Sequence, residues 1–202
     1  MNENVTVVLN AAELGHAVRS VLPARSKDPM LPVLLGLHVW AEGEGLWVEA
    51  TNRYVMARHR VDTSSQEGGA LDVVIDQVGA DQLAKILPKR EVGFVTLRLE
   101  GDAVSVELAS GFGCRLPTVD REYPNLQQIF PSEARQDDVP ATMAWDVRYL
   151  DGVLKCVKAL DPKGAPRFNM APGKDGRLPP TLVTLPGHED WSAVVMPLRI
   201  DS

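Results

Sequence analysis

Cysteine is scarce in this sequence, and long apolar runs are missing from it. The only two cysteines, Cys114 and Cys156, lie far apart, and no CxxC pair occurs. This spacing predicts neither a disulfide framework nor a zinc site, so we expect two small buried side chains in a reducing compartment. No stretch approaches the roughly 20 apolar residues that span a bilayer, and residues 1–5 lack the basic start of a signal peptide. We therefore expect a cytoplasmic protein with no membrane partner.

Positive charge is also in short supply. The 202 residues include 21 Lys and Arg against 27 Asp and Glu, which gives a net charge of −6. This balance argues against attraction of the whole surface to nucleic acid or to an anionic membrane, but it leaves a local basic face open. With 45% hydrophobic and 24% charged residues, the composition is that of a globular protein with enough chain to bury a core.

Catalytic motifs are absent as well. The sequence contains no GxSxG, HExxH or P-loop pattern. His188, Glu189 and Asp190 are adjacent and can bind a metal, but such a cluster is more typical of a solvated turn before a strand. We therefore expect no enzyme, no catalytic residues, no metal site and no cofactor; a hydrolase or metal enzyme with its site at His188 is the alternative from another class.

The sequence does contain a repeated pattern of one strand, one helix and three more strands. It occurs three times, at a period of about 65–70 residues. We call each occurrence a module. The alternation of β-branched and polar residues predicts the strands, and apolar residues at helical spacing predict the helices. The first module has strands at 5–9, 33–41, 46–51 and 55–62 and a helix at 10–22; the second has strands at 71–75, 92–99, 103–108 and 113–119 and a helix at 76–87; the third has strands at 141–145, 167–171, 181–186 and 191–200 and a helix at 146–163.

This order of elements predicts an α+β fold of antiparallel sheets with helices on one face. The composition of residues 64–69 suggests a linker. We expect a two-module domain at 1–121, a connector at 122–140 and a single module at 141–202. The third module has no second partner of its own, so it either pairs with another chain or leaves a sheet edge open.

The last strand is apolar and contains Pro197, which has no N–H for ladder pairing. We interpret it as an edge strand that leaves the sheet. Because chain ends are rarely so apolar unless they are tied down, we expect it to form one wall of a groove, or else simply to complete the core.

Four stretches, in this order and spacing, resemble the bacterial β sliding clamp, the processivity subunit of the replicative DNA polymerase. They are residues 31–36, 50–57, 116–119 with 123–125, and 194–200. The resemblance implies a DNA-clamp fold in which 1–121 is similar to the middle domain and 141–202 to the second half of the C-terminal domain. Clamp chains carry six modules, and two chains close a ring around DNA, whereas this chain carries three.

The resemblance also implies a hydrophobic groove that binds short linear motifs of polymerases and related proteins. Met, Leu, Val and Ile side chains suit the apolar anchors of an extended peptide, and Arg53 or Arg199 can bind a peptide carboxylate or carbonyl. Asn52 stands where the family usually has Asp, and Gln128 replaces a commonly basic residue. The alternative is that these residues only seal one module against another. The matching positions are Leu34, Thr51, Arg53, Tyr54, Val55, Met56, Pro124, Gln128, Ile129, Val194, Met196, Pro197, Leu198 and Arg199.

In the clamp fold the helices line the hole and carry positive charge. Here the three helical segments, 10–27, 77–90 and 146–163, carry net charges of +2, +2 and +1, which leaves −11 on the rest of the chain. That segregation suits sequence-independent contact with the phosphates of double-stranded DNA, although basic residues also simply solvate helix faces. One departure is that Gln77 and Val78 precede Gly79 where the family often has basic residues. The candidate DNA-binding residues are Arg19, Arg25, Lys27, Lys85, Lys89, Arg90, Arg148, Lys155 and Lys158.

Two clamp-related functions follow from the resemblance. The first is a homo-oligomeric, non-enzymatic accessory factor of DNA replication or repair that contacts DNA. The second is a peptide-binding adaptor or competitor that retains the groove and does not encircle DNA.

Overall fold

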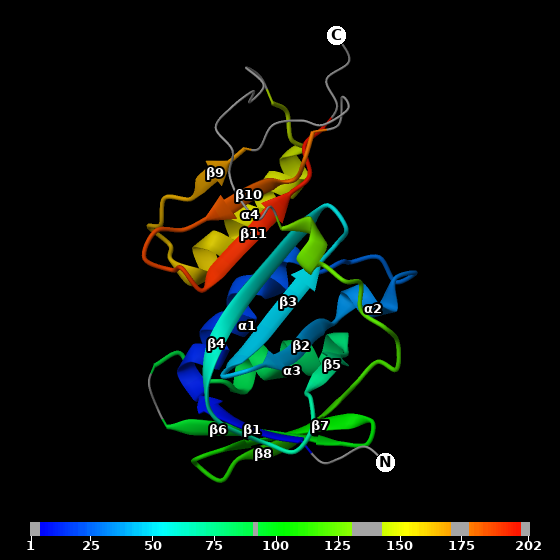
Figure 1. Ribbon diagram of the computed structural model, residues 1–202, viewed down its shortest axis with the longest axis vertical. Helices are drawn as coiled ribbons and strands as arrows, with labels where there is room; N and C mark the ends of the chain where they lie inside the picture. Colours follow the sequence, from blue (N-terminus) through cyan, green and yellow to red (C-terminus); the bar gives the residue numbers. More distant parts are fainter. Residues whose placement is uncertain (1–4, 91–92, 131–142, 171–177, 199–202) are drawn as a thin grey trace.

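The computed structural model describes residues 5–90, 93–130, 143–170 and 178–198. They form two layers: a broad antiparallel sheet in front and a row of helices behind it (Figure 1). The strands are β1 (Val5–Asn10), β2 (Leu37–Glu42), β3 (Gly45–Thr51), β4 (Val55–Glu67), β5 (Asp72–Ile75), β6 (Phe94–Glu100), β7 (Ala103–Leu108), β8 (Gly113–Pro117), β9 (Arg167–Asn169), β10 (Thr181–Thr184) and β11 (Trp191–Val195). The helices are α1 (Ala11–Val21), α2 (Pro32–Leu35), α3 (Gln77–Ile86) and α4 (Val147–Leu160), with 3-10 turns η1 (Leu22–Ala24) and η2 (Gln127–Ile129).

The predicted helix starts are confirmed by their caps. The side chains of Asn10, Asp76 and Asp146 accept hydrogen bonds from backbone N–H groups in the first turns of α1, α3 and α4. Each cap satisfies N–H groups that have no partner within the helix. The three modules therefore begin in the same way, with a strand or extended segment, a polar cap and a helix.

The long strand β4 holds the sheet together. Its first residues pair with β3 on one side and with β11 on the other, and its last residues pair with β1. β1 also pairs with β6, and β5 pairs with β2, so each of the first two modules contributes its first strand to the other's sheet. The order is β5-β2-β3-β4-β1-β6-β7-β8, with β11, β10 and β9 branching from β4.

The third module is joined to the first through this branch. β11 runs antiparallel to β4, with Trp191 opposite His59 and Val195 opposite Val55. The prediction that the last strand is an edge strand is therefore wrong, because β11 lies between β10 and β4. The predicted effect of Pro197 is confirmed, since the ladder stops at Val195. The expectation that the third module has no partner of its own, and so pairs with another chain or leaves its edge open, is also wrong, because β11 pairs with β4 of the first module.

Three further predictions need correction. Residues 32–35 form the short helix α2 instead of the start of a strand, because Pro32 suits a first helical turn. The supposed linker continues as strand to Glu67, because β1 offers an open edge to residues 63–67. In the described part of 141–145, only an isolated bridge between Ala144 and Leu198 is formed. Residues 91–92, 131–142, 171–177 and 199–202 lie outside the described residues, and with them one end of the strands predicted at 92–99, 141–145, 167–171 and 191–200.

The helices cover one face of the sheet. α1 packs between α3 and α4, and most of its residues are buried. The main apolar core runs from this helix row through the inward-facing residues of all three modules. We call the sheet face turned away from the helices the outer face. No described helix is long and apolar enough to cross a membrane.

Candidate functional site

An apolar groove lies where three distant parts of the chain meet. These are the β3–β4 turn, the described part of the connector (residues 122–130) and the end of β11 (Figure 1), and Leu34 of α2 completes the lining. The pairing of β11 with β4 brings the first and last of them together, with Val194 opposite Met56. The cavity has a volume of about 170 Å³ and is lined by Leu34, Thr51, Arg53, Tyr54, Val55, Met56, Pro124, Leu126, Ile129, Val194 and Met196.

The β3–β4 turn is shaped by two polar side chains. The Asn52 Oδ1 atom accepts hydrogen bonds from the N–H groups of Tyr54 and Val55, at 3.0 and 2.7 Å. The Thr51 hydroxyl donates to the Val55 carbonyl and accepts from the Arg53 N–H. Together they hold Arg53 at a φ of 78°, in the left-handed region, where a residue with a Cβ is under strain. The turn therefore directs Arg53 and Tyr54 to the groove rim.

The groove has a buried floor and an exposed rim. Leu34, Met56 and Val194 belong to a second apolar cluster, separate from the main core. Tyr54 is 43% exposed and Ile129 is 38% exposed. The Tyr54 ring stacks on Tyr149 of α4 at 4.5 Å between centroids. A floor of this kind accepts apolar side chains, and the rim leaves room for a backbone to pass.

The connector is fastened to the outer face by aromatic contacts. Tyr123 stacks on His38 at 4.3 Å, and Phe130 covers the Arg58 guanidinium at 3.7 Å. Arg58 lies at the same time over Trp47, at 5.0 Å. Cation–π contact with these two rings offsets the cost of removing the Arg58 guanidinium from water. These two attachments flank the residues that form the connector wall of the groove.

The end of β11 is fixed by backbone hydrogen bonds. The Met196 N–H donates to the Tyr54 carbonyl at 2.9 Å, and the Leu198 N–H donates to the Ala144 carbonyl at 2.7 Å. Pro197 lies between them. The last described residues are thus held against the turn that forms the opposite wall.

The structure brings most of the predicted groove residues together, and a few lie elsewhere. Gln128 is exposed, Pro197 and Leu198 follow the lining residues without joining them, and Arg199 lies outside the described residues. Leu126 lines the cavity and was not predicted, although it directly follows the Tyr-Pro-Asn stretch that carried the resemblance. Tyr149 was also missed, because its helical spacing indicated only a core-facing position.

Comparisons with known proteins identify relatives of this chain. No family model matches it. The β sliding clamp of Micrococcus luteus is 32% identical over 139 residues, which cover 67% of this chain and 44% of that protein. The chain belongs to the bacterial β sliding clamp family.

Solved clamps confirm the DNA-clamp fold. The DNA polymerase III β subunit of Thermotoga maritima superposes with a TM-score of 0.76 at 13% identity, covering 98% of this chain and 66% of that one. The Bacillus subtilis clamp gives 0.76 at 17% identity, covering 97% and 64%. The chain thus spans less than half of the Micrococcus clamp and about two thirds of these solved clamps.

The basic residues expected on a clamp's helix row fall into two groups. Arg19 donates to the carbonyls of Ala84, Leu87 and Pro88, and so ties α1 to the end of α3. Arg25 pairs with Asp81 at 2.8 Å. The exposed residues Lys27, Lys85, Lys89, Arg90 and Lys158 are the second group.

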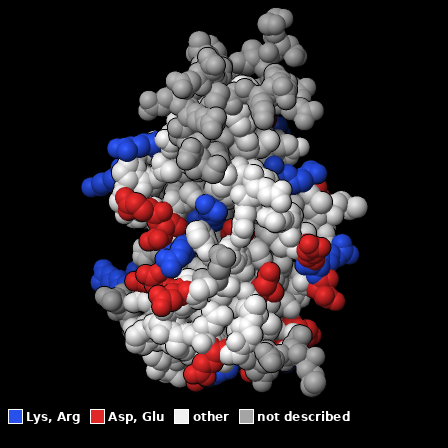
Figure 2. All heavy atoms as spheres, viewed as in Figure 1, with Lys and Arg blue, Asp and Glu red and all other residues white. Residues whose placement is uncertain are grey.

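Two cations of α4 are paired on the surface. Lys155 lies 2.6 Å from Asp151, and Arg148 pairs with the cap residue Asp146. Hydrogen bonds from Arg148 lower the pKa of Asp146 to about 2. These contacts leave the cations exposed but partly neutralised. On the sheet side, acidic and basic side chains are interspersed (Figure 2).

The turn at 188–190 was the candidate metal site. The Glu189 carboxylate accepts from the Gly187 N–H, and the His188 carbonyl accepts from the Trp191 N–H. Within the described ranges, no three His, Cys, Asp or Glu side chains are grouped so as to hold a metal ion. The alternative of a metal enzyme with a site at His188 therefore has no support in this turn.

Proposed function

We propose that this chain is a non-enzymatic, clamp-type accessory factor of DNA replication or repair, and that its groove binds short linear motifs of polymerases and related proteins. One observation carries the proposal: three segments distant in sequence enclose an apolar cavity at the positions that the clamp resemblance predicts. We further propose that residues 1–121 correspond to a clamp middle domain and 141–202 to half of a C-terminal domain, joined by the connector 122–140. Such a protein works in the cytoplasm, where its replication partners are.

The chemistry of the groove favours an extended peptide with one or two apolar anchors. Met56 and Met196 are adaptable in shape and accept different side chains. Arg53 projects from the rim beside Tyr54, with its guanidinium 5.7 Å from the ring, and is available for a peptide carbonyl or carboxylate. We include Leu198 and Arg199, which follow the lining residues in sequence, in the proposed peptide-binding site.

Contact with double-stranded DNA is the second part of the proposal. The exposed cations on the helix side, above all Lys85, Lys89 and Arg90 after and within α3, suit phosphates without reading sequence. The outer strands β8 and β9 each pair on one side only among the described strands. They give a second copy of the chain an edge to pair with, so we propose a homo-oligomer.

A specific observation favours the adaptor as a second candidate. The groove is formed within a single chain, whereas Arg19, Arg25, Arg148 and Lys155 are engaged by groups of the protein itself. Peptide binding therefore does not require oligomerisation. The four engaged cations contribute less to DNA affinity than free cations would. Light scattering together with a DNA-binding assay separates the two candidates.

Peptide binding is tested by fluorescence anisotropy with a labelled clamp-binding peptide from a bacterial replicative polymerase. Met196→Ala removes lining atoms, and we expect it to weaken binding about tenfold, equivalent to about 1.4 kcal/mol. Met30→Ala is the matched control, because Met30 is 83% exposed and lies outside the groove. Absence of binding by the unmodified chain, or equal losses in both variants, contradicts the proposal.

A further inference from the structure

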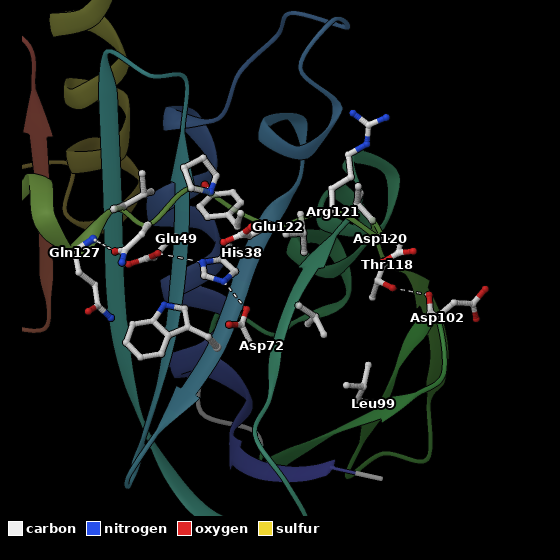
Figure 3. Close-up of a pocket in the computed structure, with 18 of the residues that line it drawn as sticks. His38, Glu49, Asp72, Leu99, Asp102, Thr118, Asp120, Arg121, Glu122 and Gln127 are labelled. Atoms are coloured by element: carbon white, nitrogen blue, oxygen red, sulfur yellow. Dashed lines mark hydrogen bonds and ion pairs between the residues drawn. The ribbon is translucent and has the colours of Figure 1, made fainter. Parts of the chain in front are cut away.

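A second and larger cavity lies across the connector from the groove. Its volume is about 880 Å³, and it opens over the outer face of β2, β3 and β5 (Figure 3). Pro124 and Leu126 line both the cavity and the groove. Its lining is strongly acidic, with a single Arg, Arg121, against Glu49, Asp72, Asp102, Asp120 and Glu122.

Two buried polar atoms of this lining have no hydrogen-bond partner among the described residues. They are the Glu49 Oε1 atom and the Tyr123 hydroxyl. Glu49 is 2% exposed and Tyr123 is 8% exposed. Leaving such groups unpaired costs about 1–3 kcal/mol each, and more for a charged group. Each atom can therefore accept a hydrogen bond from water or from a ligand.

The other Glu49 oxygen is already engaged. His38 Nδ1 lies 3.1 Å from Glu49 Oε2, and His38 Nε2 lies 2.8 Å from Asp72 Oδ1. Figure 3 shows the imidazole between these two carboxylates. Its ring also stacks on Tyr123. The imidazole thus holds the Glu49 carboxylate through Oε2, and Tyr123 packs on the imidazole, while Oε1 stays unpaired.

Neither of the nearby arginines, Arg58 and Arg121, donates to Glu49 Oε1. Arg58, opposite Glu49 on β4, lies between Trp47 and Phe130 and donates from Nε to Ser192. The Arg121 side chain extends away from the His38–Glu49 pair (Figure 3). Burial, together with the charge of Glu49, raises the pKa of Tyr123, so its side chain remains a neutral phenol. The site combines a fixed carboxylate oxygen, a hydroxyl and an acidic rim.

We propose that this cavity binds an organic cation, a guanidinium or primary ammonium group at the end of a flexible chain. Its N–H groups donate to Glu49 Oε1 and to the Tyr123 hydroxyl oxygen, and the rim carboxylates attract it by charge. Trp40, which also lines the cavity, offers an aromatic face to the cation. The same group occurs on an Arg or Lys side chain of a bound protein and on a free polyamine. This inference goes beyond peptide capture in the groove and does not depend on it.

Titration calorimetry of the full chain at low ionic strength tests the proposal with three probes: agmatine, spermidine and a blocked Gly-Arg-Gly peptide. We expect saturable binding of at least one probe. Glu49→Gln should weaken it at least about tenfold, and Tyr123→Phe should weaken it several-fold. Asp151→Asn, which removes an exposed carboxylate of α4, should leave it unchanged. Tighter binding of the peptide indicates a protein side chain as the natural source, and tighter binding of agmatine or spermidine indicates a free polyamine.

The fold of each variant is checked by circular dichroism. If Glu49→Gln does not fold, the test rests on Tyr123→Phe, which keeps the ring that packs on His38, and on the rim variant Asp120→Asn, because Asp120 is exposed. Absence of saturable binding for all three probes overturns the proposal. Equal affinity of the unmodified chain and the folded cavity variants overturns it as well.

Discussion

Asn52 shows how a single side chain can shape the groove. Asn52 stands where the clamp family usually has Asp. Only the Oδ1 atom is used in the turn, as an acceptor, and a carboxylate accepts in the same way, so the turn tolerates the change. The left-handed conformation of Arg53 could not be predicted, because no glycine or asparagine at position 53 signals it.

His59 is a residue whose protonation bears on stability. Burial, followed by the charges of His188 and His16, lowers the pKa of His59 to about 4. Ser20 donates its hydroxyl hydrogen to the Ala17 carbonyl, so His59 Nδ1 donates to Ser20 Oγ, 2.9 Å away. Because Nδ1 already carries a hydrogen in this neutral form, an added proton goes to Nε2, and burial of the ring disfavours the resulting positive charge.

We expect this neutral histidine to destabilise the protein in acid. Between the unfolded pKa of about 6.5 and the folded value, the unfolded chain binds a proton that the folded chain does not, so stability falls as pH falls. From pH 7 to pH 5 the loss due to His59 should be about 1–2 kcal/mol. Urea unfolding of the unmodified chain and of His59→Gln measures it as the difference between their pH dependences. Parallel pH dependences would contradict this assignment.

At the scale of elements, the local sequence pattern predicted the helices and the central strands. Apolar residues at helical spacing predicted helices that begin at 10, 76 and 146, and the alternation of β-branched and polar residues predicted the central strands. The errors arose where contact with a distant part of the chain determines the secondary structure. The composition of residues 64–69 predicted a linker, but residues 64–67 are strand because β1 lies beside them. Residues 33–35, predicted as the start of a strand, belong to the helical turn α2.

The connector is the element on which the groove most depends. Phe130→Ala removes the cover over Arg58, and we expect a loss of about 3 kcal/mol in stability and faster amide exchange at residues 123–129. Phe112→Ala is the control, because Phe112 is 48% exposed, and it should change stability by less than about 0.5 kcal/mol. Hydrogen exchange by mass spectrometry and urea unfolding measure both effects. Unchanged exchange in the connector would mean that it is held by other contacts.

At the scale of the whole molecule, the return of the third module to the first builds the groove. Periodicity predicted three modules and left the third either to pair with another chain or to leave a sheet edge open; this is wrong, because β11 pairs with β4 within the chain. The resemblance placed the last strand opposite residues 51–56, and the structure pairs β11 with β4. Apolar strands of similar composition carry no local signal of which edge they join, so spacing alone could not decide this.

The helix row yields a prediction about DNA. Lys85→Gln with Lys89→Gln removes two exposed charges from the helix side, and we expect DNA affinity to fall and the slope of log K against log salt to decrease by about 2. Arg98→Gln with Arg115→Gln removes two charges from β6 and β8, where both are paired with acids, and should have a smaller effect. A filter-binding or anisotropy series over salt concentrations measures the slopes. Equal effects of the two pairs would contradict a DNA-facing helix row.

The central claim is that the end of β11 and the start of β4 form one peptide-binding groove. It is tested most directly by NMR of the unmodified chain with ¹³C-labelled methionine methyl groups, titrated with the clamp-binding peptide. Met56 and Met196 line the groove, and Met30 lies outside it. We predict that the Met56 and Met196 signals shift together and saturate, while the Met30 signal stays in place. Saturation of peptide binding without a shift of Met56 and Met196, or no binding at all, would contradict the claim.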